Sequence, residues 1–337
     1  MVRYATVRLI TIVPVTLALM ILTFIVTQLL PTNPAVVAAG PLATPEQVAQ
    51  MEARLGLDKS IPEQLVAFLG RLFTGDLGQS IGTGNAVIED LVRRLPSTMV
   101  LTTSGVLVGF VLAIGLAVVT ANRERGVLAS VGKTFGGLGS SVPDFVVGPI
   151  LILLFYVAIP VFPVPIGQGG SGADVPAVTG AALLDAVIAG NGGAIVDALT
   201  HLALPSLTLA LCYAAPIYRV AVSSIEEISR RRFVDYVILN GGSNKLRWRY
   251  VLENAFPPIL TMSGLVYGLL IGGAVVVEAI FSWGGIGEYA VESITGNDFF
   301  AIQGFVMVTA VLSMLIYLSV DLIHAWLDPR TIKRSAS

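Results

Sequence analysis

The sequence predicts an all-α, polytopic membrane protein with six transmembrane helices and both termini in the cytoplasm. The first observation is composition: 55% of the 337 residues are hydrophobic and only 12% are charged. The mean hydropathy is +0.82, which exceeds what water-soluble domains usually show. The second and third observations are long apolar runs and an uneven distribution of basic residues between them. The net charge of -2 gives no indication of nucleic-acid binding, so the expected environment is the lipid bilayer.

Six apolar runs are each long enough to cross a hydrocarbon core of about 30 Å as a helix. The first run, 9–30, has 22 uncharged residues, and a helix of that length measures about 33 Å. A secretory signal is the alternative, because Arg3 and Arg8 precede the run, but signal cores usually have only about 7 to 15 apolar residues. The other predicted spans are 98–121, 135–159, 198–218, 257–280 and 299–323.

The basic residues fix the predicted orientation. With six spans, 15 of the 20 Lys and Arg residues fall on one side, seven of them in 219–256. The opposite side has five, all in the first long loop, and its other loops carry only acidic charge. The rule that cytoplasmic loops are rich in Lys and Arg places both termini and 219–256 in the cytoplasm. Those five basic residues are Arg54, Lys59, Arg71, Arg93 and Arg94.

This topology divides the chain into four predicted regions. Residues 1–30 are an N-terminal tail with the first span, and 31–97 are an extracytoplasmic cap region. Residues 98–325 are a five-helix core that includes the cytoplasmic loop 219–256, and 326–337 are a cytoplasmic tail.

The two larger external loops are predicted to differ in structure. In the cap region, Thr44 precedes Pro45, and Gln47 occupies the position that completes a capping box, so we expect a helix to begin there. In the second external loop, 160–178, frequent Pro and Gly residues favour irregular backbone.

The segment GVLASVGKT, 126–134, resembles a phosphate-binding P-loop but has one residue too many between its glycines, and no strand pattern precedes it. We therefore do not predict nucleotide binding there. Lys133 is expected to anchor the cytoplasmic end of the third span.

Other chemically reactive side chains are sparse. His201 and His324 lie on different spans near opposite faces, which argues against a metal site within this chain. The only cysteine, Cys212, lies in an apolar run and is interpreted as a small buried hydrophobic residue.

Three acidic residues lie within predicted spans, where burying a charge costs at least about 2.5 kcal/mol and normally implies a partner or a cavity. We expect Asp144 and Asp321 to reach headgroups or cap a neighbouring helix. For Glu278 two interpretations stay open: it lines a pathway, or it faces the external interface.

Within the cytoplasmic loop, 230–254 leaves the membrane and returns, with apolar residues interspersed among charged ones. This pattern predicts a short amphipathic helical hairpin. The sequence 241–244, Gly-Gly-Ser-Asn, suits the left-handed backbone between its two helices. Such a hairpin can dock into another protein.

The ordered segments of the chain resemble the permease subunits of ABC importers, specifically the dipeptide/oligopeptide/nickel branch. The segments that carry the resemblance include LLPTNPA, RLPSTMVLT, SSVPDFVVG, HLALPSLTLAL, the DYV and NAFPP ends of the cytoplasmic loop, GGAVVVEAIFSWGGIGEYAVESI and VDLIHAWLDPR. They run over nearly the whole chain and together are highly specific. The resemblance implies the type I ABC importer permease fold in a prokaryotic plasma (inner) membrane.

In this resemblance, the hairpin corresponds to the family's EAA loop, whose short helix sits in a groove of an ATPase subunit. The implied coupling residues are Asp235, Tyr236, Gly241, Gly242, Asn244, Lys245, Arg247, Arg249 and Asn254. Asn244 stands where the family usually has the loop glycine, and Gly241 and Gly242 stand where it commonly has Arg-Ala. Two interpretations stay open: the loop glycine has shifted two places, or Asn244 has replaced it. Because Asn tolerates a left-handed backbone, we expect the fold of the hairpin to be kept.

The implied function is ATP-driven import of di- or oligopeptides delivered by an extracytoplasmic substrate-binding protein. The implied partners are a second homologous permease and two ATPase subunits, which use ATP and Mg; this chain is expected to bind no cofactor and to have no catalytic residue. Glu278 is the one candidate for the substrate path. Nickel or another peptide-like cargo is the alternative within the same class.

A more distant alternative is an ion-coupled secondary transporter, which would be expected to carry ionisable residues at mid-membrane. Such residues are nearly absent here, and no pair of residues in the spans suggests an intramembrane enzyme.

Overall fold

The computed structural model of the chain describes residues 2–28, 33–40, 42–121, 123, 126–139, 141–170 and 175–327. These residues are almost entirely helical. In chain order the helices are α1 (Val2–Gln28), α2 (Pro34–Ala39), α3 (Pro45–Leu55), α4 (Ile61–Phe73), α5 (Val87–Thr120), α6 (Val127–Leu138), α7 (Asp144–Ile152), the π-helix η1 (Leu153–Ala158), α8 (Ala182–Ile188), α9 (Gly192–Ser229), α10 (Arg232–Leu239), α11 (Asn244–Gly273), α12 (Val275–Phe281), α13 (Ile286–Thr295) and α14 (Phe299–Leu327).

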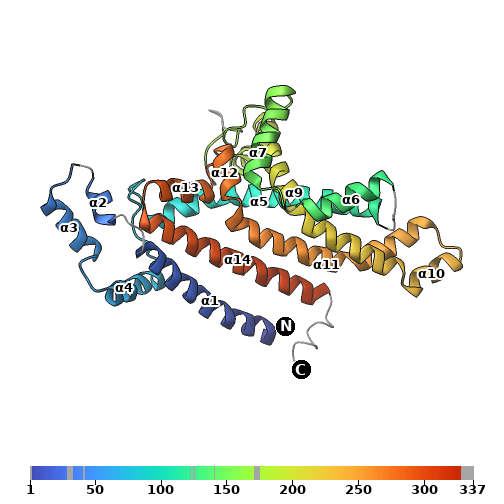
Figure 1. Cartoon of the computed structure of the whole chain (residues 1–337), viewed down its shortest axis with the longest axis horizontal. Coiled ribbons are helices and arrows are strands. Elements are labelled where there is room, and N and C mark those ends of the chain that lie inside the picture. The colour runs from blue at the N-terminus through green and yellow to red at the C-terminus, as the bar shows by residue number, and fades with distance from the viewer. Residues whose placement is uncertain are drawn as a thin grey trace.

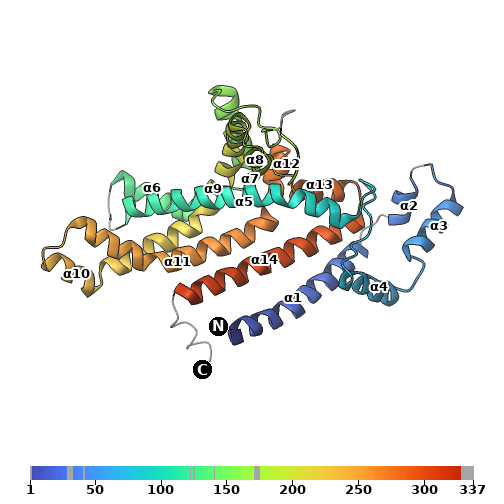
Figure 2. The same ribbon diagram turned by 180° about the vertical axis from the view of Figure 1, so that it is seen from behind.

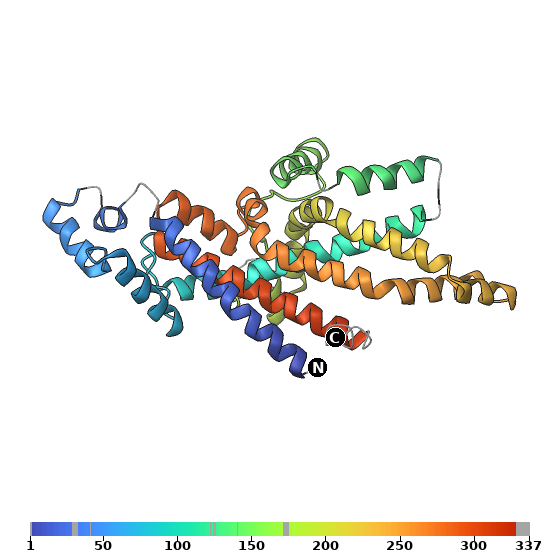
Figure 3. The same cartoon turned by 60° about the horizontal axis from the view of Figure 1, so that its bottom comes forward.

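The long helices α1, α5, α9, α11 and α14 run lengthwise through the molecule (Figure 1). Helices α2, α3 and α4 lie at one end, which we call the cap end, and α10 lies at the other, which we call the hairpin end (Figure 2). The beginning of α1 and the last described turn of α14 both point toward the hairpin end (Figure 3). The first described residues of α1 and the last described residues of α14 therefore lie toward the same end of the bundle as α10.

Four of the described helices are long and apolar enough to cross a membrane, namely α5, α9, α11 and residues Phe299–Ile323 of α14. The first predicted span overlaps the shorter apolar stretch Pro14–Gln28 of α1. The third overlaps Asp144–Ala158, which consists of α7 and η1. The long helices also extend beyond the apolar runs. Helix α9 covers 192–229 where 198–218 was predicted, because backbone hydrogen bonding continues into polar sequence outside the hydrocarbon core.

Two predicted spans are interrupted. The run 135–159 is not one helix, because α6 ends at Leu138 and α7 begins after Pro143; proline disfavours helical backbone in the residue before it. The run 257–280 is divided at Ala274, which separates α11 from α12. Residues 328–337, most of the predicted tail, lie outside the described residues.

Glycines set the close packing of the long helices. A Cβ added at Gly105 of α5 would lie 2.8 Å from Leu209 Cβ of α9. Between α11 and α14, a Cβ on Gly264 or Gly268 would lie 2.2 Å from Val320 or Tyr317. Small residues therefore let these helices approach as membrane helices often do, whereas Gly272, one turn after Gly268, has open space beside it.

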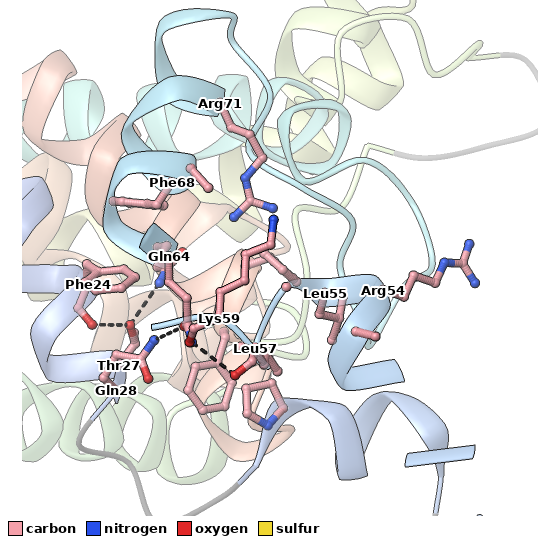
Figure 4. Close-up of a pocket in the computed structure, with 17 residues that line it drawn as sticks. Phe24, Thr27, Gln28, Arg54, Leu55, Leu57, Lys59, Gln64, Phe68 and Arg71 are labelled. Atoms are coloured by element: carbon pink, nitrogen blue, oxygen red, sulfur yellow. Dashed lines mark hydrogen bonds between the residues drawn. The ribbon is translucent and has the colours of Figure 1, made fainter. Parts of the chain in front are cut away.

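The cap region is attached to α1 and α14 around a small pocket of about 260 Å³ (Figure 4). Gln28 of α1 donates a hydrogen bond to Gln64 Oε1 of α4 at 2.7 Å, and Gln64 in turn donates to the Leu57 carbonyl at 3.1 Å. Phe24 stacks on Phe68 with ring centroids 5.6 Å apart. These polar and aromatic contacts hold α4 against the end of α1.

The capping box predicted at the start of α3 is confirmed. Gln47 Oε1 accepts from the Thr44 backbone N–H at 2.8 Å, and Thr44 Oγ1 accepts from the Gln47 N–H at 3.4 Å. The predicted irregular loop is also confirmed over its described parts, 160–170 and 175–178, which contain no helix.

Candidate functional site

The hairpin end is built by α10, a four-residue connection and the first turns of α11; we call residues 231–254 the coupling hairpin. Helix α10 closes with two hydrogen bonds that share the geometry of a Schellman cap. The Gly242 N–H donates to the Val237 carbonyl at 2.8 Å, and the Gly241 N–H donates to the Ile238 carbonyl at 3.0 Å. The connection is therefore a defined turn.

The two glycines of this turn are needed for different reasons. Gly241 has a φ of +77°, in the left-handed region that favours glycine. A Cβ at Gly242 would lie 2.6 Å from both Cγ1 and the carbonyl oxygen of Val237, so Gly242 is required by a close approach. The pair predicted to form the break does form it.

Of the two interpretations of the loop glycine, its replacement by a left-handed Asn244 is wrong. Asn244 is the first residue of α11, and Ser243 is its N-cap, whose hydroxyl accepts from the Leu246 N–H at 3.2 Å. The left-handed position lies three residues earlier, at Gly241. In the sequence, Asn tolerates both a left-handed turn and a helix start, so composition alone does not locate the left-handed residue.

The predicted coupling residues all lie in this hairpin, and most are exposed. Arg247 and Gly242 are half-buried, whereas Asp235, Tyr236, Gly241, Asn244, Lys245, Arg249 and Asn254 are exposed. Two of them make contacts along α11: Arg249 Nε pairs with Glu253 Oε1 at 2.7 Å, and the Asn254 amide donates to the Tyr250 carbonyl at 2.8 Å.

Large apolar side chains of α10 face away from the bundle. Leu239 is 83% exposed and Tyr236 is 67% exposed, and Phe233 and Ile238 are also exposed. Val234 is fully buried and joins the main hydrophobic core. Helix α10 is thus anchored through Val234, while its other large apolar side chains are exposed among the described residues, a pattern typical of interaction surfaces.

Glu278 stands in a different setting. Its side chain is 0% exposed. One carboxylate oxygen accepts from Thr98 Oγ1 at 2.7 Å, and the other accepts from the backbone N–H groups of Gly287 at 2.8 Å and Glu288 at 3.1 Å. Both N–H groups belong to the first turn of α13, where a helix favours negative charge.

Further contacts complete this cluster, which we call the Glu278 clasp (Ser97, Thr98, Glu278 and residues 283–288). Thr98 Oγ1 also accepts from the Ile286 N–H at 2.9 Å, and Trp283 Nε1 donates to the Ser97 carbonyl at 2.9 Å. The clasp therefore joins α12 and α13 to α5. In this structure the carboxylate of Glu278 is fully buried among donors from α5 and α13, so it does not face the external interface.

A second polar junction secures the cap end. Asp298 accepts from Ser80 Oγ at 2.6 Å and from the Gly82 N–H at 3.0 Å through the same oxygen, while its other oxygen accepts from the Ala301 N–H at 3.1 Å. It caps α14 and holds the segment that precedes α5.

Sequence reasoning missed Thr98, Trp283 and Asp298. The segments RLPST and EAIFSWGGIGE are distinctive, but the contact between Thr98 and Glu278 joins residues 180 positions apart. Neither periodicity nor spacing indicates such a contact.

Among the hollows that border the bundle, two are lined partly by α5. At the cap end, a cavity of about 1,330 Å³ lies between the start of α5, the irregular loop and the start of α9, and charged residues of both signs line it, among them Glu89, Arg93 and Asp197. Between α5, α11 and α14, a mainly apolar groove of about 400 Å³ carries the hydroxyls of Thr103 and Tyr267, 2.9 Å apart.

The described residues contain no group of three or more His, Cys, Asp or Glu side chains that could hold a metal ion. His201 Nδ1 lies 3.3 Å from Asp197 Oδ1 on the same helix, and the side chain of His324 lies outside the described part. Cys212 is buried.

Residues 95–333 match the family described as the binding-protein-dependent transport system inner membrane component. Residues 1–102 match the N-terminal region of membrane components of the same systems. The two matches cover nearly the whole chain.

Several bacterial proteins are similar over almost their full length. The probable D,D-dipeptide transport system permease protein of Escherichia coli K12 is 36% identical over 92% of each chain. The dipeptide transport system permease protein of Alkalihalophilus pseudofirmus is 32% identical over 98% of this chain and 99% of its own. The glutathione transport system permease protein of Pectobacterium atrosepticum is 30% identical over 98% of each.

Proposed function

The chain belongs to the family of inner membrane components of binding-protein-dependent transport systems, and we propose that it is a permease subunit of an ATP-driven importer of di- and oligopeptides. As a family member it is a multi-pass plasma-membrane protein and a transport component rather than an enzyme. The peptide cargo is supported by the similar proteins, which are named for dipeptide and glutathione transport.

The proposed topology has six spans and cytoplasmic termini. Four spans are the long apolar helices, and the other two are the apolar helices near 14–28 and 144–158. The hairpin end is cytoplasmic, because the loop 219–256 carries seven of the 20 basic residues. Residues 31–97 form the external cap, and 98–325 form the permease core with the coupling hairpin.

The observation that carries the proposal is the apolar surface of α10, held between two long helices. Helix α9 ends at Ser229 just before α10, and α11 continues unbroken from Asn244 to Gly273, a length of about 45 Å. A force on α10 is therefore delivered directly to two helices that cross the membrane. The proposed source of this force is a separate ATPase subunit that binds the exposed side chains of Tyr236 and Leu239.

The remaining partners follow from this mechanism. A substrate-binding protein delivers peptide at the cap end, a second homologous permease forms the other half of the translocation path, and two ATPase subunits bind ATP and Mg. Closure of the ATPases draws the two coupling hairpins together and rocks the bundles between inward-open and outward-open states.

Deletion of 235–245 tests this function. We expect the shortened chain to insert in the membrane and assemble with its partner permease, and to lose both ATPase association and dipeptide uptake in proteoliposomes. Native copurification and uptake of a radiolabelled dipeptide measure the two effects. Normal uptake by the deletion variant would contradict the proposed coupling role.

A further inference from the structure

The pocket of about 260 Å³ between the cap region, the end of α1 and the start of α14 (Figure 4), which we call the cap pocket, is lined by three cations and by no carboxylate of the described residues. Arg54 comes from α3, Lys59 from the connection between α3 and α4, and Arg71 from α4. These are three of the five basic residues of the predicted external loops, where Lys and Arg are usually scarce. Their concentration around one small pocket indicates a site for an anion.

The three cations have no counter-charge in the part of the chain that the structure describes, where none of them forms an ion pair. The guanidinium carbon of Arg71 lies 5.2 Å from the centre of the Phe300 ring, a contact that holds the guanidinium in place and leaves its N–H groups available. In Figure 4 the side chains of Lys59 and Arg71 extend toward one another, whereas Arg54 extends away. Two like charges that converge repel each other, and an anion between them removes that cost.

The neutral polar side chains of the cap pocket, in contrast, bind one another. Gln28 donates to Gln64 Oε1 at 2.7 Å, and Gln303 donates to Thr27 Oγ1 at 2.9 Å. The hydrogen-bonding capacity that the pocket leaves unused is therefore mainly that of its cations.

The remaining wall of the cap pocket is apolar and selects among anions. Phe24 and Phe68 stack on each other, and Leu55 and Phe299 also line the pocket. An inorganic anion such as phosphate has no apolar part to place against these side chains. The volume is also below the range of about 300 to 1,000 Å³ that is typical of sites enclosing a small-molecule ligand. An acidic side chain of another protein fits better, because its methylene groups can contact the rings while its carboxylate binds a guanidinium through paired hydrogen bonds.

We propose that the cap pocket binds an Asp or Glu side chain of a protein that docks on the cap end from outside the membrane. The inference rests on the proposed function, which identifies this protein as the substrate-binding protein. Arg71, which is half-buried, binds the carboxylate, and Lys59 closes over it from the exposed rim. Arg54, which is exposed, contributes attraction before contact.

Carbodiimide cross-linking tests the contact, because this reagent joins a lysine amine to a carboxylate that touches it. Lys59 is one of four lysines and the only one in the predicted external segments. In the assembled transporter mixed with its purified substrate-binding protein and a dipeptide, we expect an amide between Lys59 and an Asp or Glu of the binding protein, identified by mass spectrometry of proteolytic fragments. Lys59→Arg should abolish this product and keep the affinity for the binding protein.

The affinity of the binding protein for the transporter in nanodiscs, measured by biolayer interferometry, tests the role of Arg71. Arg71→Gln should weaken binding about tenfold, mainly through faster dissociation, as expected for the loss of one partner of a desolvated charge pair. Arg71→Lys keeps the charge but not the paired geometry and should recover part of the affinity. Arg93→Gln is the matched control, because Arg93 is an exposed basic residue of the same predicted side that does not line the cap pocket; it should leave dissociation unchanged.

Equal weakening by Arg71→Gln and Arg93→Gln would assign the effect to the overall positive charge of the cap end and overturn the proposal. A Lys59 product formed only with the dipeptide, or only with carboxylates of this chain, would also overturn it. If the binding protein did not associate with the transporter at all, the proposed function would fail. If it bound the original chain and Arg71→Gln equally well, the cap-pocket site alone would fail.

Discussion

The coupling hairpin and the Glu278 clasp lie at opposite ends of α11, and their side chains differ in how far other residues of the chain cover them. The hairpin leaves Leu239 and Tyr236 in the open. The clasp buries a carboxylate completely and surrounds it with donors from α5 and α13. The comparison indicates that the clasp is satisfied by residues of this chain, whereas the hairpin leaves large apolar side chains exposed, as expected of the proposed docking surface.

This contrast also assigns different mechanical roles. A fully paired buried polar cluster fixes the relative position of the elements it joins, so the clasp holds α12 and α13 on α5 during movement. The hairpin is anchored through Val234 and exposes its other apolar residues, so it can move with α9 and α11 when a partner pulls it.

The largest effect is expected from Glu278→Ala. This change leaves the N–H groups of Gly287 and Glu288 buried without their acceptor, and it should cost roughly 3 kcal/mol or more of stability. Thermal unfolding of the purified complex in detergent measures the loss. Glu292→Ala is the matched control, because Glu292 forms only a surface ion pair with Arg94, worth about 1 kcal/mol or less. Equal destabilisation by the two changes would show that the buried hydrogen bonds of Glu278 stabilise the protein no more than the surface ion pair of Glu292 does.

An intermediate effect is expected from Leu239→Asp. A charge in the exposed apolar face of α10 should weaken ATPase binding by about 2 kcal/mol, the size of an interface hot spot, with little change in thermal stability. Binding of the purified ATPase to immobilised permease complex measures the change. Val66→Asp serves as the control, since Val66 is equally apolar and 70% exposed but lies on α4 at the cap end. If Val66→Asp weakened ATPase binding as much, the hairpin would lose its special role.

The smallest effect concerns the start of α4, which resembles the clasp in chemistry but is exposed. Ser60 donates to Glu63 Oε2 through its hydroxyl at 2.7 Å and its backbone N–H at 3.0 Å. These bonds, the hydroxyl first, lower the pKa of Glu63. The stabilisation is therefore present above the unfolded-state pKa of about 4.3 and is lost as the pH falls through the lower folded-state pKa.

A spin label at position 66 should report this loss as increased mobility of α4 when the pH is lowered from 6 to about 3. In Glu63→Gln the carboxylate is absent at every pH, so the pH-dependent part should disappear. A mobility change of the same size in that variant would assign the effect to another group.

Local sequence signals predicted the hairpin well, for reasons that the structure makes clear. Gly241 and Gly242 form the turn, and a capping box at Thr44 starts α3, because both features depend on neighbours within a few residues. The basic residues indicated the same end of the bundle as the beginning of α1 and the end of α14.

The contacts of the Glu278 clasp could not be predicted from such local sequence signals. Glu278 was recognised as a costly charge within an apolar run, but its partners Thr98 and Gly287 are brought to it by the packing of α5 and by the break after α12. The break before Pro143 was similarly hidden within one apolar run. Hydrophobicity indicates where a segment is buried, and it does not show where a helix stops or what it meets.

Cross-linking from α10 tests the central claim most directly. The chain has one cysteine, Cys212, so a Cys212→Ser background permits a single new cysteine at position 239 or, as the control, at position 66, each carrying a photoreactive group in the assembled transporter. The account predicts an adduct between position 239 and an ATPase subunit, with a yield that changes on ATP addition, and none from position 66. A transport-competent complex that gives no ATPase adduct from position 239 would contradict it.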